Sequence, residues 1–355
     1  MVQTRPHRLI DLQAFPKDSQ DVRIAQALEM NVVYATLSYC WGKDMPQGST
    51  TTLGNIHERE ECLKPSELPQ TLRDAIKVTR WLDIRYLWID ALCIIQDSLE
   101  DWQIESAKMA SVYGNGVISI SVDLSTSCVE GFLVPKPEEQ NICYNHEVKI
   151  SNTLSTGESS NLYVWIRDIC GCFIKDGIDS LQRTVLSTRG WTYQEKFLAP
   201  RILHFIGSQV LWECREKYGI PLESGMELKE MQIQHKTQTL FGSLADSLLN
   251  PNFWPEKGEL LENYWYEKVV PEYSIRALTN GNDKLPAIGG IAKTFAQRLG
   301  YKYIAGLWLD DFVYGLFWGT KDGASFPLEY RAPSVSAARD PVNFTYSIPI
   351  PTDSS

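Results

Sequence analysis

Residues 86–97 read YLWIDALCIIQD, and this stretch decides the fold. A continuous apolar run with aromatic and β-branched residues predicts a strand that is covered on both faces. Asp90 falls near the carboxyl end of that strand, which is where open α/β sheets bind their ligands. The stretch therefore predicts how the core is built and where a site lies.

Strand and helix patterns alternate around this stretch. Residues 34–38 have the pattern of a short strand, and Pro69 opens an amphipathic helix. Residues 98–101 (SLED) resemble a capping box that starts a second helix, and residues 117–123 predict another strand. This alternation predicts the α/β class, with a parallel sheet and flanking helices.

The ends of these strands carry polar and aromatic residues. Right-handed crossovers bring the carboxyl ends of parallel strands to one edge of the sheet. We therefore expect residues 38–42, residues 90–96 and Asp123 to share that edge.

The second half of the chain has weaker patterns. Residues 124–185 predict an insertion of short strands and loops, and residues 201–206 and 209–214 predict a hairpin turning at Gly207-Ser208. Apolar residues between 309 and 317 have helical spacing, with Gly319 as a candidate cap. The last fifteen residues are rich in Pro and Ser and predict a loose tail.

Composition excludes several classes of protein. The net charge of −10 argues against broad binding to nucleic acid, and no apolar run is long enough to span a bilayer. The N-terminus lacks the apolar core of a signal peptide, and eight scattered cysteines favour reduced thiols in a cytoplasmic protein. Cys170 and Cys172 form the one close pair, and without a second pair nearby we expect no metal site.

Glu105 is the most unusual residue of the predicted helices. Trp102, Ser106, Met109 and Tyr113 form one core-facing stripe, and helical spacing places Glu105 on the same face. A buried carboxylate is costly unless it is paired or lines a cavity. Two alternatives stay open, a structural acid bonded to an amide or an Arg, and a catalytic or ligand-binding acid.

Other candidates each have a structural alternative. Asp90 could line the site or cap the next segment, and Trp41 could stack on a ring or belong to the core. A buried thiol is the favoured interpretation of Cys93, because no His lies nearby in sequence to activate it. His204 is interpreted as a satisfied residue within a strand. The common phosphate-loop, dinucleotide, zinc and hydrolase motifs are missing from the sequence.

Taken together, ordered segments resemble the heterokaryon incompatibility (HET) domain of filamentous fungi. The segments are residues 8–11, 34–42, 68–76, 86–97, 101–102 with Glu105 and Met109, 112–113, 189–195, 200–205, 212–214, 273–279, 283–288 and 303–308. The chain departs from the family pattern at residues 335–338 (VSAA), where relatives usually have Trp-Ser-Trp.

The resemblance implies a domain order. Residues 1–195 would form the HET domain, including the insertion, residues 196–333 a mixed α+β C-terminal extension, and residues 334–355 the tail. HET domains are distantly similar to TIR domains, which have a flavodoxin-like parallel sheet. The resemblance therefore implies a flavodoxin/TIR-like fold for the first domain.

The same resemblance implies an activity and its residues. Some TIR domains cleave NAD at the nicotinamide–ribose bond with a glutamate on the helix after the third strand, and Glu105 has the matching placement. Ser38, Trp41, Gly42 and Asp90 would then bind the substrate at the edge of the sheet. NAD would be a substrate, and no cofactor or metal is expected.

Three functions are left open by the sequence. The first is an NAD glycohydrolase-like enzyme that triggers cell death when unlike fungal cells fuse. The second is a non-catalytic signalling module that self-associates or binds a partner incompatibility protein. The third is an enzyme of secondary metabolism that acts on a small molecule. None of the three implies binding to nucleic acid or to a membrane.

Overall fold

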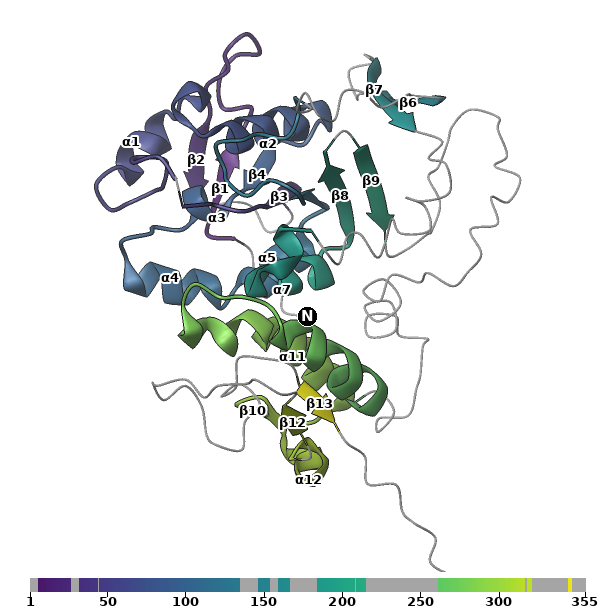
Figure 1. Cartoon of the computed structure of the whole chain (residues 1–355). Coiled ribbons are helices and arrows are strands. Elements are labelled where there is room, and N and C mark those ends of the chain that lie inside the picture. The colour runs from purple at the N-terminus through teal and green to yellow at the C-terminus, as the bar shows by residue number, and fades with distance from the viewer. Residues whose placement is uncertain are drawn as a thin grey trace, which may run out of the picture. The chain divides into compact units, whose positions relative to one another are not determined.

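The structure is a computed structural model of the chain (Figure 1). It describes residues 6–26, 32–43, 45–134, 184–207 and 261–316, together with strands at 146–153, 159–166, 209–214, 318–320 and 344–346. The chain divides into a first unit of residues 1–187 with 198–242, and a second unit of residues 188–197 with 243–355.

A seven-stranded sheet forms the centre of the first unit, which confirms the predicted α/β class. Its four middle strands are parallel and stand in the order second, first, third, fourth of their sequence in the chain. This is the order of flavodoxin-like sheets, and the flanking strands pair antiparallel. Across the sheet the strands are β2 (Arg23–Gln26), β1 (Arg8–Asp11), β4 (Tyr86–Trp88), β3 (Tyr34–Ser38), β5 (Ile118–Val122), β8 (Arg201–Ile206) and β9 (Gln209–Cys214).

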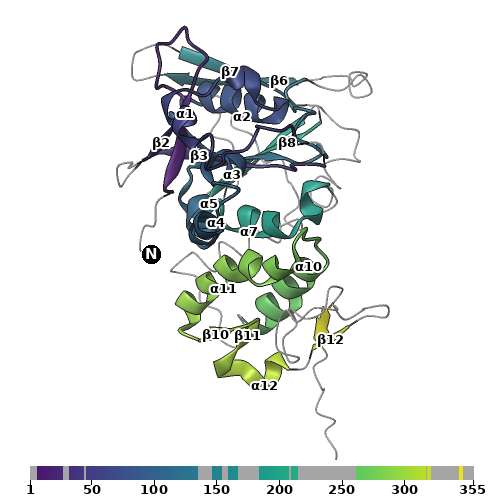
Figure 2. The ribbon, with the colours of Figure 1, turned by 90° about the vertical axis from the view of Figure 1, so that its left-hand side faces the viewer.

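Helices cover both faces of this sheet. Figure 2 shows α2 (Gln70–Trp81) on one side, and α4 (Leu99–Ser106) and α5 (Met109–Asn115) on the other. The Tyr34 hydroxyl donates to the Val112 carbonyl oxygen over 2.7 Å, which fixes α5 against β3. This unit also contains two short helices, α1 (Ile56–Glu61) and α3 (Asp90–Cys93).

The two faces of the middle strands differ in chemistry. Side chains alternate between the faces of a strand, so the register assigns each residue to a face. The face toward α2 is apolar and carries Ala35, Leu37, Ile120, Val122, Leu203 and Phe205. The face toward α5, here called the hydroxyl face, carries Thr36, Ser38, Ser119, Ser121 and His204, all at most 3% exposed.

Local predictions agree with the structure in part. Ser98 caps α4 by accepting from the Asp101 backbone N–H over 3.3 Å, as the capping-box pattern predicts. The strand in residues 86–97 is short, because Asp90 already begins α3. The predicted single helix through Glu105 breaks at residues 107–108, so the stripe is interrupted and Trp102 is only half-buried.

The predicted hairpin of β8 and β9 is confirmed, with Gly207 in the left-handed region at φ +58°. The predicted insertion contains two paired strands, β6 (His146–Thr153) and β7 (Ser159–Ile166). Cys170 and Cys172 lie outside the described residues, as does most of the predicted tail, although β13 (Phe344–Tyr346) forms a strand within it. The predicted cap at Gly319 is wrong, because this residue lies in β12 (Trp318–Thr320), which pairs with β13.

The second unit is mainly helical with short strand pairs, in agreement with the predicted α+β extension. Its apolar centre contains Trp265, Phe295, Tyr303 and Trp308, whose rings meet with centroids 5.1–6.3 Å apart. Its elements are α7 (Gly190–Leu198), η4 (Leu261–Val269), α10 (Val270–Ser274), η5 (Gly281–Lys284), α11 (Pro286–Leu299), β10 (Tyr303–Ile304), β11 (Leu307–Trp308), η6 (Leu309–Asp311) and α12 (Phe312–Gly315), with β12 and β13. Among the described residues, no helix has the length and apolar character that crossing a membrane requires.

A carboxyl group of the second unit gives its stability a pH dependence. Burial raises the pKa of Glu272 to about 7, against the opposing effects of Arg276, Tyr193 and Lys268. The folded state therefore holds a proton that the unfolded chain releases near pH 4, so this stabilisation is complete below that pH and is lost as the pH rises through about 7. We expect Glu272→Gln to remove this loss, so that its unfolding free energy rises relative to wild type by up to about 3 kcal/mol between pH 5 and pH 8.

Urea unfolding of both proteins across this pH range measures the difference. Glu267→Gln is the matched control, because Glu267 is exposed one turn away. Parallel pH curves for wild type and Glu272→Gln would contradict the prediction.

Candidate functional site

The carboxyl ends of β3 and β4 are joined by a side-chain contact. The Trp41 indole N–H donates to Asp90 Oδ2 over 2.9 Å, and Asp90 Oδ1 accepts from the Ala91 backbone N–H over 2.7 Å. Asp90 is therefore the first residue of α3, where its carboxylate bonds the next backbone N–H and holds Trp41, whereas Ile89 is the N-cap. Trp41 is half-buried, so part of its ring remains accessible at the edge of the sheet.

The loop after β3 also packs against the loop after β5. The Cys128 backbone N–H donates to the Trp41 carbonyl oxygen over 3.1 Å. Gly42 has φ +77°, and a Cβ there would lie 2.6–2.8 Å from atoms of Ser127. Only glycine fits this close approach, so the structure assigns Gly42 a packing role.

These two loops leave the sheet at its topological switch point. β3 and β5 are neighbours in the sheet. After β3 the chain continues to β4 toward one edge of the sheet, and after β5 it continues to β8 toward the other edge. Ligands of open α/β sheets bind in the crevice outside the strand ends at such a point. Ser38, which ends β3, is only 2% exposed, so its side chain belongs to the layer beneath this edge.

A longer segment of the loop after β3 is anchored by Thr51. Its hydroxyl donates to the Leu92 carbonyl oxygen over 2.7 Å and accepts from Arg59 over 3.0 Å. Its backbone N–H donates to the Ala91 carbonyl oxygen over 2.9 Å, and its carbonyl oxygen accepts from the Gln96 N–H over 2.8 Å. The loop is thereby fixed to α3 beside Asp90.

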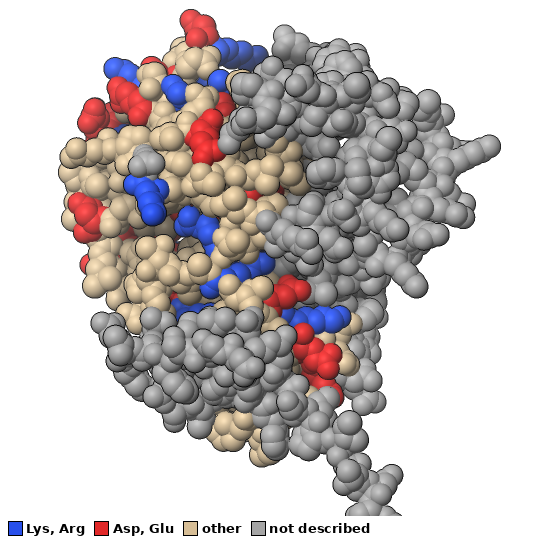
Figure 3. Space-filling view, viewed as in Figure 1, with Lys and Arg blue, Asp and Glu red and all other residues tan. Residues whose placement is uncertain are grey.

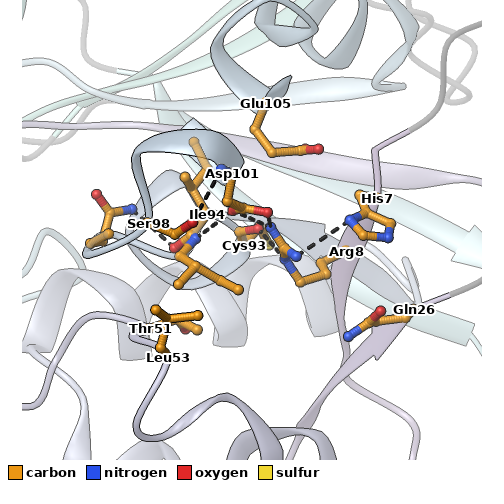
Figure 4. Close-up of polar contacts among 12 residues, drawn as sticks. His7, Arg8, Gln26, Thr51, Leu53, Cys93, Ile94, Ser98, Asp101 and Glu105 are labelled. Atoms are coloured by element: carbon orange, nitrogen blue, oxygen red, sulfur yellow. Dashed lines mark hydrogen bonds and ion pairs between the residues drawn. The ribbon is translucent and has the colours of Figure 1, made fainter. Parts of the chain in front are cut away.

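An ion pair between the buried Arg8 and the partly buried Asp101 holds α4 in place (Figure 4). The Arg8 guanidinium contacts both carboxylate oxygens of Asp101 and donates from Nε to the Cys93 carbonyl oxygen over 2.7 Å. Asp101 Oδ2 also accepts from the Ile95 N–H over 2.8 Å. Burial acts to raise the pKa of Asp101, but the bonds from Arg8 and Ile95 outweigh it and lower that pKa below its usual value.

Glu105 lies one turn further along α4, on the same side as Asp101 (Figure 4). Its side chain is 1% exposed, and Oε1 accepts from Lys108 Nζ over 2.8 Å. Oε2 is buried and has no hydrogen-bond partner among the described residues. The carboxylate is therefore half satisfied, because one oxygen is paired and the other is left without a donor.

A second buried cluster was missed by the sequence analysis. His204 Nδ1 lies 2.9 Å from Asp123 Oδ2, and His204 Nε2 lies 3.0 Å from Glu213 Oε2. Asp123 follows β5, His204 lies within β8 and Glu213 within β9, so the three come together only through strand pairing. His204 is satisfied within the sheet, as interpreted from the sequence, but its carboxylate partners were not foreseen.

Residues 34–195 match the family model described as heterokaryon incompatibility protein (HET). These residues form a HET domain. No curated protein and no solved structure matches the chain. All five predicted site residues, Ser38, Trp41, Gly42, Asp90 and Glu105, fall inside the matched range.

Cys93 of the HET domain is a buried thiol, as the sequence favoured. It is 0% exposed, and burial raises the pKa of its thiol to about 12, with smaller opposing effects from a backbone hydrogen bond to Ile89 and from Arg8. A thiol in this state is a poor nucleophile at neutral pH.

One face of the described residues has no single sign of charge. In Figure 3, the coloured part of this face carries both Lys and Arg side chains and Asp and Glu side chains, among uncharged residues. Binding at the edge of the sheet would therefore depend on local contacts.

The His204 cluster gives a prediction about protonation in the first unit. A neutral imidazole has one N–H, whereas both ring nitrogens of His204 face a carboxylate oxygen, so the protonated ring satisfies both contacts. We expect ¹⁵N NMR at pH 7.5 to show protons on both nitrogens of His204. The signal should revert to a neutral ring in Asp123→Asn, and a neutral ring in the wild type would contradict the assignment.

Proposed function

We propose that the HET domain binds NAD or a related nucleotide at the carboxyl edge of its parallel sheet and cleaves the nicotinamide–ribose bond to trigger cell death. The observation that carries this proposal is Glu105, a buried carboxylate with one oxygen free of any partner among the described residues. A buried carboxylate oxygen without a donor needs an explanation, and a catalytic role is one of those that apply.

The chemistry asks for a carboxylate of this kind. Loss of nicotinamide leaves positive charge on the ribose, and Glu105 Oε2 would stabilise this charge while it accepts a bond from a ribose hydroxyl. Water then adds to the ribose carbon, which gives ADP-ribose and releases one proton to solvent. Trp41 would stack on a ring of the nucleotide, and Asp90 would hold Trp41 in position through the 2.9 Å bond. Gly42 and Ser38 would shape the edge of the sheet.

Access to Glu105 requires a local movement. The carboxylate is 1% exposed, but the side chain of its partner Lys108 is 28% exposed. Lys108 directly precedes α5, at the break between the two helices. A swing of this Lys toward solvent would release Oε1 and uncover the carboxylate.

The second candidate function is a non-catalytic signalling module. The ion pair of Glu105 with Lys108 favours this candidate. A buried acid that is paired with a Lys can have a purely structural role. In this case the HET domain would act by self-association or by binding a partner protein. A death response that depends on oligomerisation and survives loss of Glu105 would support this candidate.

The two candidates make opposite predictions for nicotinamide release. Under the enzymatic proposal, purified full-length protein at high concentration releases nicotinamide from NAD, and Glu105→Gln lowers the rate at least about 100-fold. Glu100→Gln is the matched control, because Glu100 is exposed on the same helix, and it should keep the wild-type rate. Thermal unfolding of each variant checks that the fold is retained. No release by the wild type, or equal release by Glu105→Gln, would overturn the enzymatic proposal.

A further inference from the structure

The hydroxyl face of the sheet is polar where a parallel sheet is ordinarily apolar. Sheets of this class are covered on both sides by helices, and their strands are built from Val, Ile and Leu. The face toward α2 follows this rule, whereas the face toward α5 carries a Thr and three Ser residues on two adjacent strands. The buried polar residues are therefore concentrated in the layer between the sheet and α5.

Three polar atoms of this layer are left without partners. Thr36 Oγ1, Trp88 Nε1 and Ser121 Oγ are buried and make no hydrogen bond to any described residue. The three residues are each 0% exposed. A buried polar group without a partner is destabilising, so three in one layer would offset a large fraction of the marginal stability of a domain.

Strand pairing places Trp88 and Ser121 on either side of Thr36, with Trp88 directly beside it and Ser121 one diagonal step away on β5. Thr36 is paired in register with Trp88 of β4, and Ser38, two residues further along β3, is paired with Ser121 of β5. All three side chains therefore share the hydroxyl face. α5 and its C-cap Gly116 cover Trp88 and Thr36, since the Tyr113 ring contacts Trp88 at 5.6 Å between centroids and a Cβ at Gly116 would lie 3.1 Å from Thr36 Cγ2.

The chemistry of the three atoms defines what would satisfy them. The Trp88 N–H only donates and needs an acceptor, whereas the hydroxyls of Thr36 and Ser121 can donate or accept. An O–H group meets all three needs, because its oxygen accepts and its hydrogen donates. A full charge is not required, since the three atoms carry none.

We propose that this layer, between β4, β3 and β5 and helix α5, is a binding site for a small hydroxyl-bearing occupant. The occupant is ordered water or a small polyol, and it accepts from Trp88 while it bonds to Thr36 and Ser121. Buried waters of this kind make about three hydrogen bonds and are part of the structure. This site is separate from the proposed NAD chemistry and does not depend on it.

Nearly isosteric substitutions test the proposal in the full chain. Thr36→Val and Ser121→Ala keep the approximate shape and remove only the hydroxyl. If the occupant is present, each loses a hydrogen bond, and the unfolding equilibrium constant in urea rises about five-fold or more. If nothing is bound, removing an unsatisfied hydroxyl leaves stability unchanged or raises it.

Thr79→Val calibrates the measurement, because Thr79 is 0% exposed and its hydroxyl donates to the Ala75 carbonyl oxygen within α2 over 2.7 Å. Its loss shows the cost of removing a hydroxyl with a known partner. The proposal is overturned if Thr36→Val or Ser121→Ala is as stable as the wild type or more stable.

The source of the occupant is distinguished by comparing protein as purified with protein refolded from urea in polyol-free buffer. Equal losses in both preparations, with no added mass in native mass spectrometry, identify water. A loss confined to the purified preparation, with an added mass that glycerol or ribose restores after refolding, identifies a polyol.

Discussion

The placement of α4 depends on the ion pair of Arg8, which is buried, with Asp101, which is partly buried. Arg8 is on β1 near an edge of the sheet, and its guanidinium binds the carboxylate in the first turn of α4 as well as the carbonyl oxygen that ends α3. Breaking such a pair by removing one partner costs several kcal/mol, because the other charge stays buried alone. This pair fixes the start of the helix, and the helix carries Glu105 one turn later.

The polar groups of the first unit form two levels. At the edge, Trp41, Asp90 and Gly42 are held by loops that pack on one another, so this level is rigid and partly accessible. Beneath it, the hydroxyl face and Glu105 are sealed by α4 and α5. The proposed nucleotide chemistry requires Glu105 to become accessible from the edge of the sheet. The break between α4 and α5 is where such a movement would occur, because the helical hydrogen bonds are interrupted there.

Much of this arrangement could be predicted from sequence where the determinants are local. Ser98 signals its own cap, and helical spacing places Glu105 on the inner face even though the helix is broken. The break itself had no signal, because Ala107 and Lys108 are good helix formers. The Asp123–His204–Glu213 cluster also had none, because the pairing of β5, β8 and β9 brings together residues that are far apart in the chain.

We propose that a nucleotide binds at the switch-point edge beside Trp41. Its indole N–H already bonds Asp90, so a ring stacked on Trp41 must change the environment of that proton. NMR of indole-¹⁵N-labelled protein during titration with NAD measures this directly, with the Trp41 signal assigned from Trp41→Phe. The account predicts a saturable shift of the Trp41 signal, with the Trp265 signal of the second unit unmoved. An unmoved Trp41 signal at saturating NAD would contradict it.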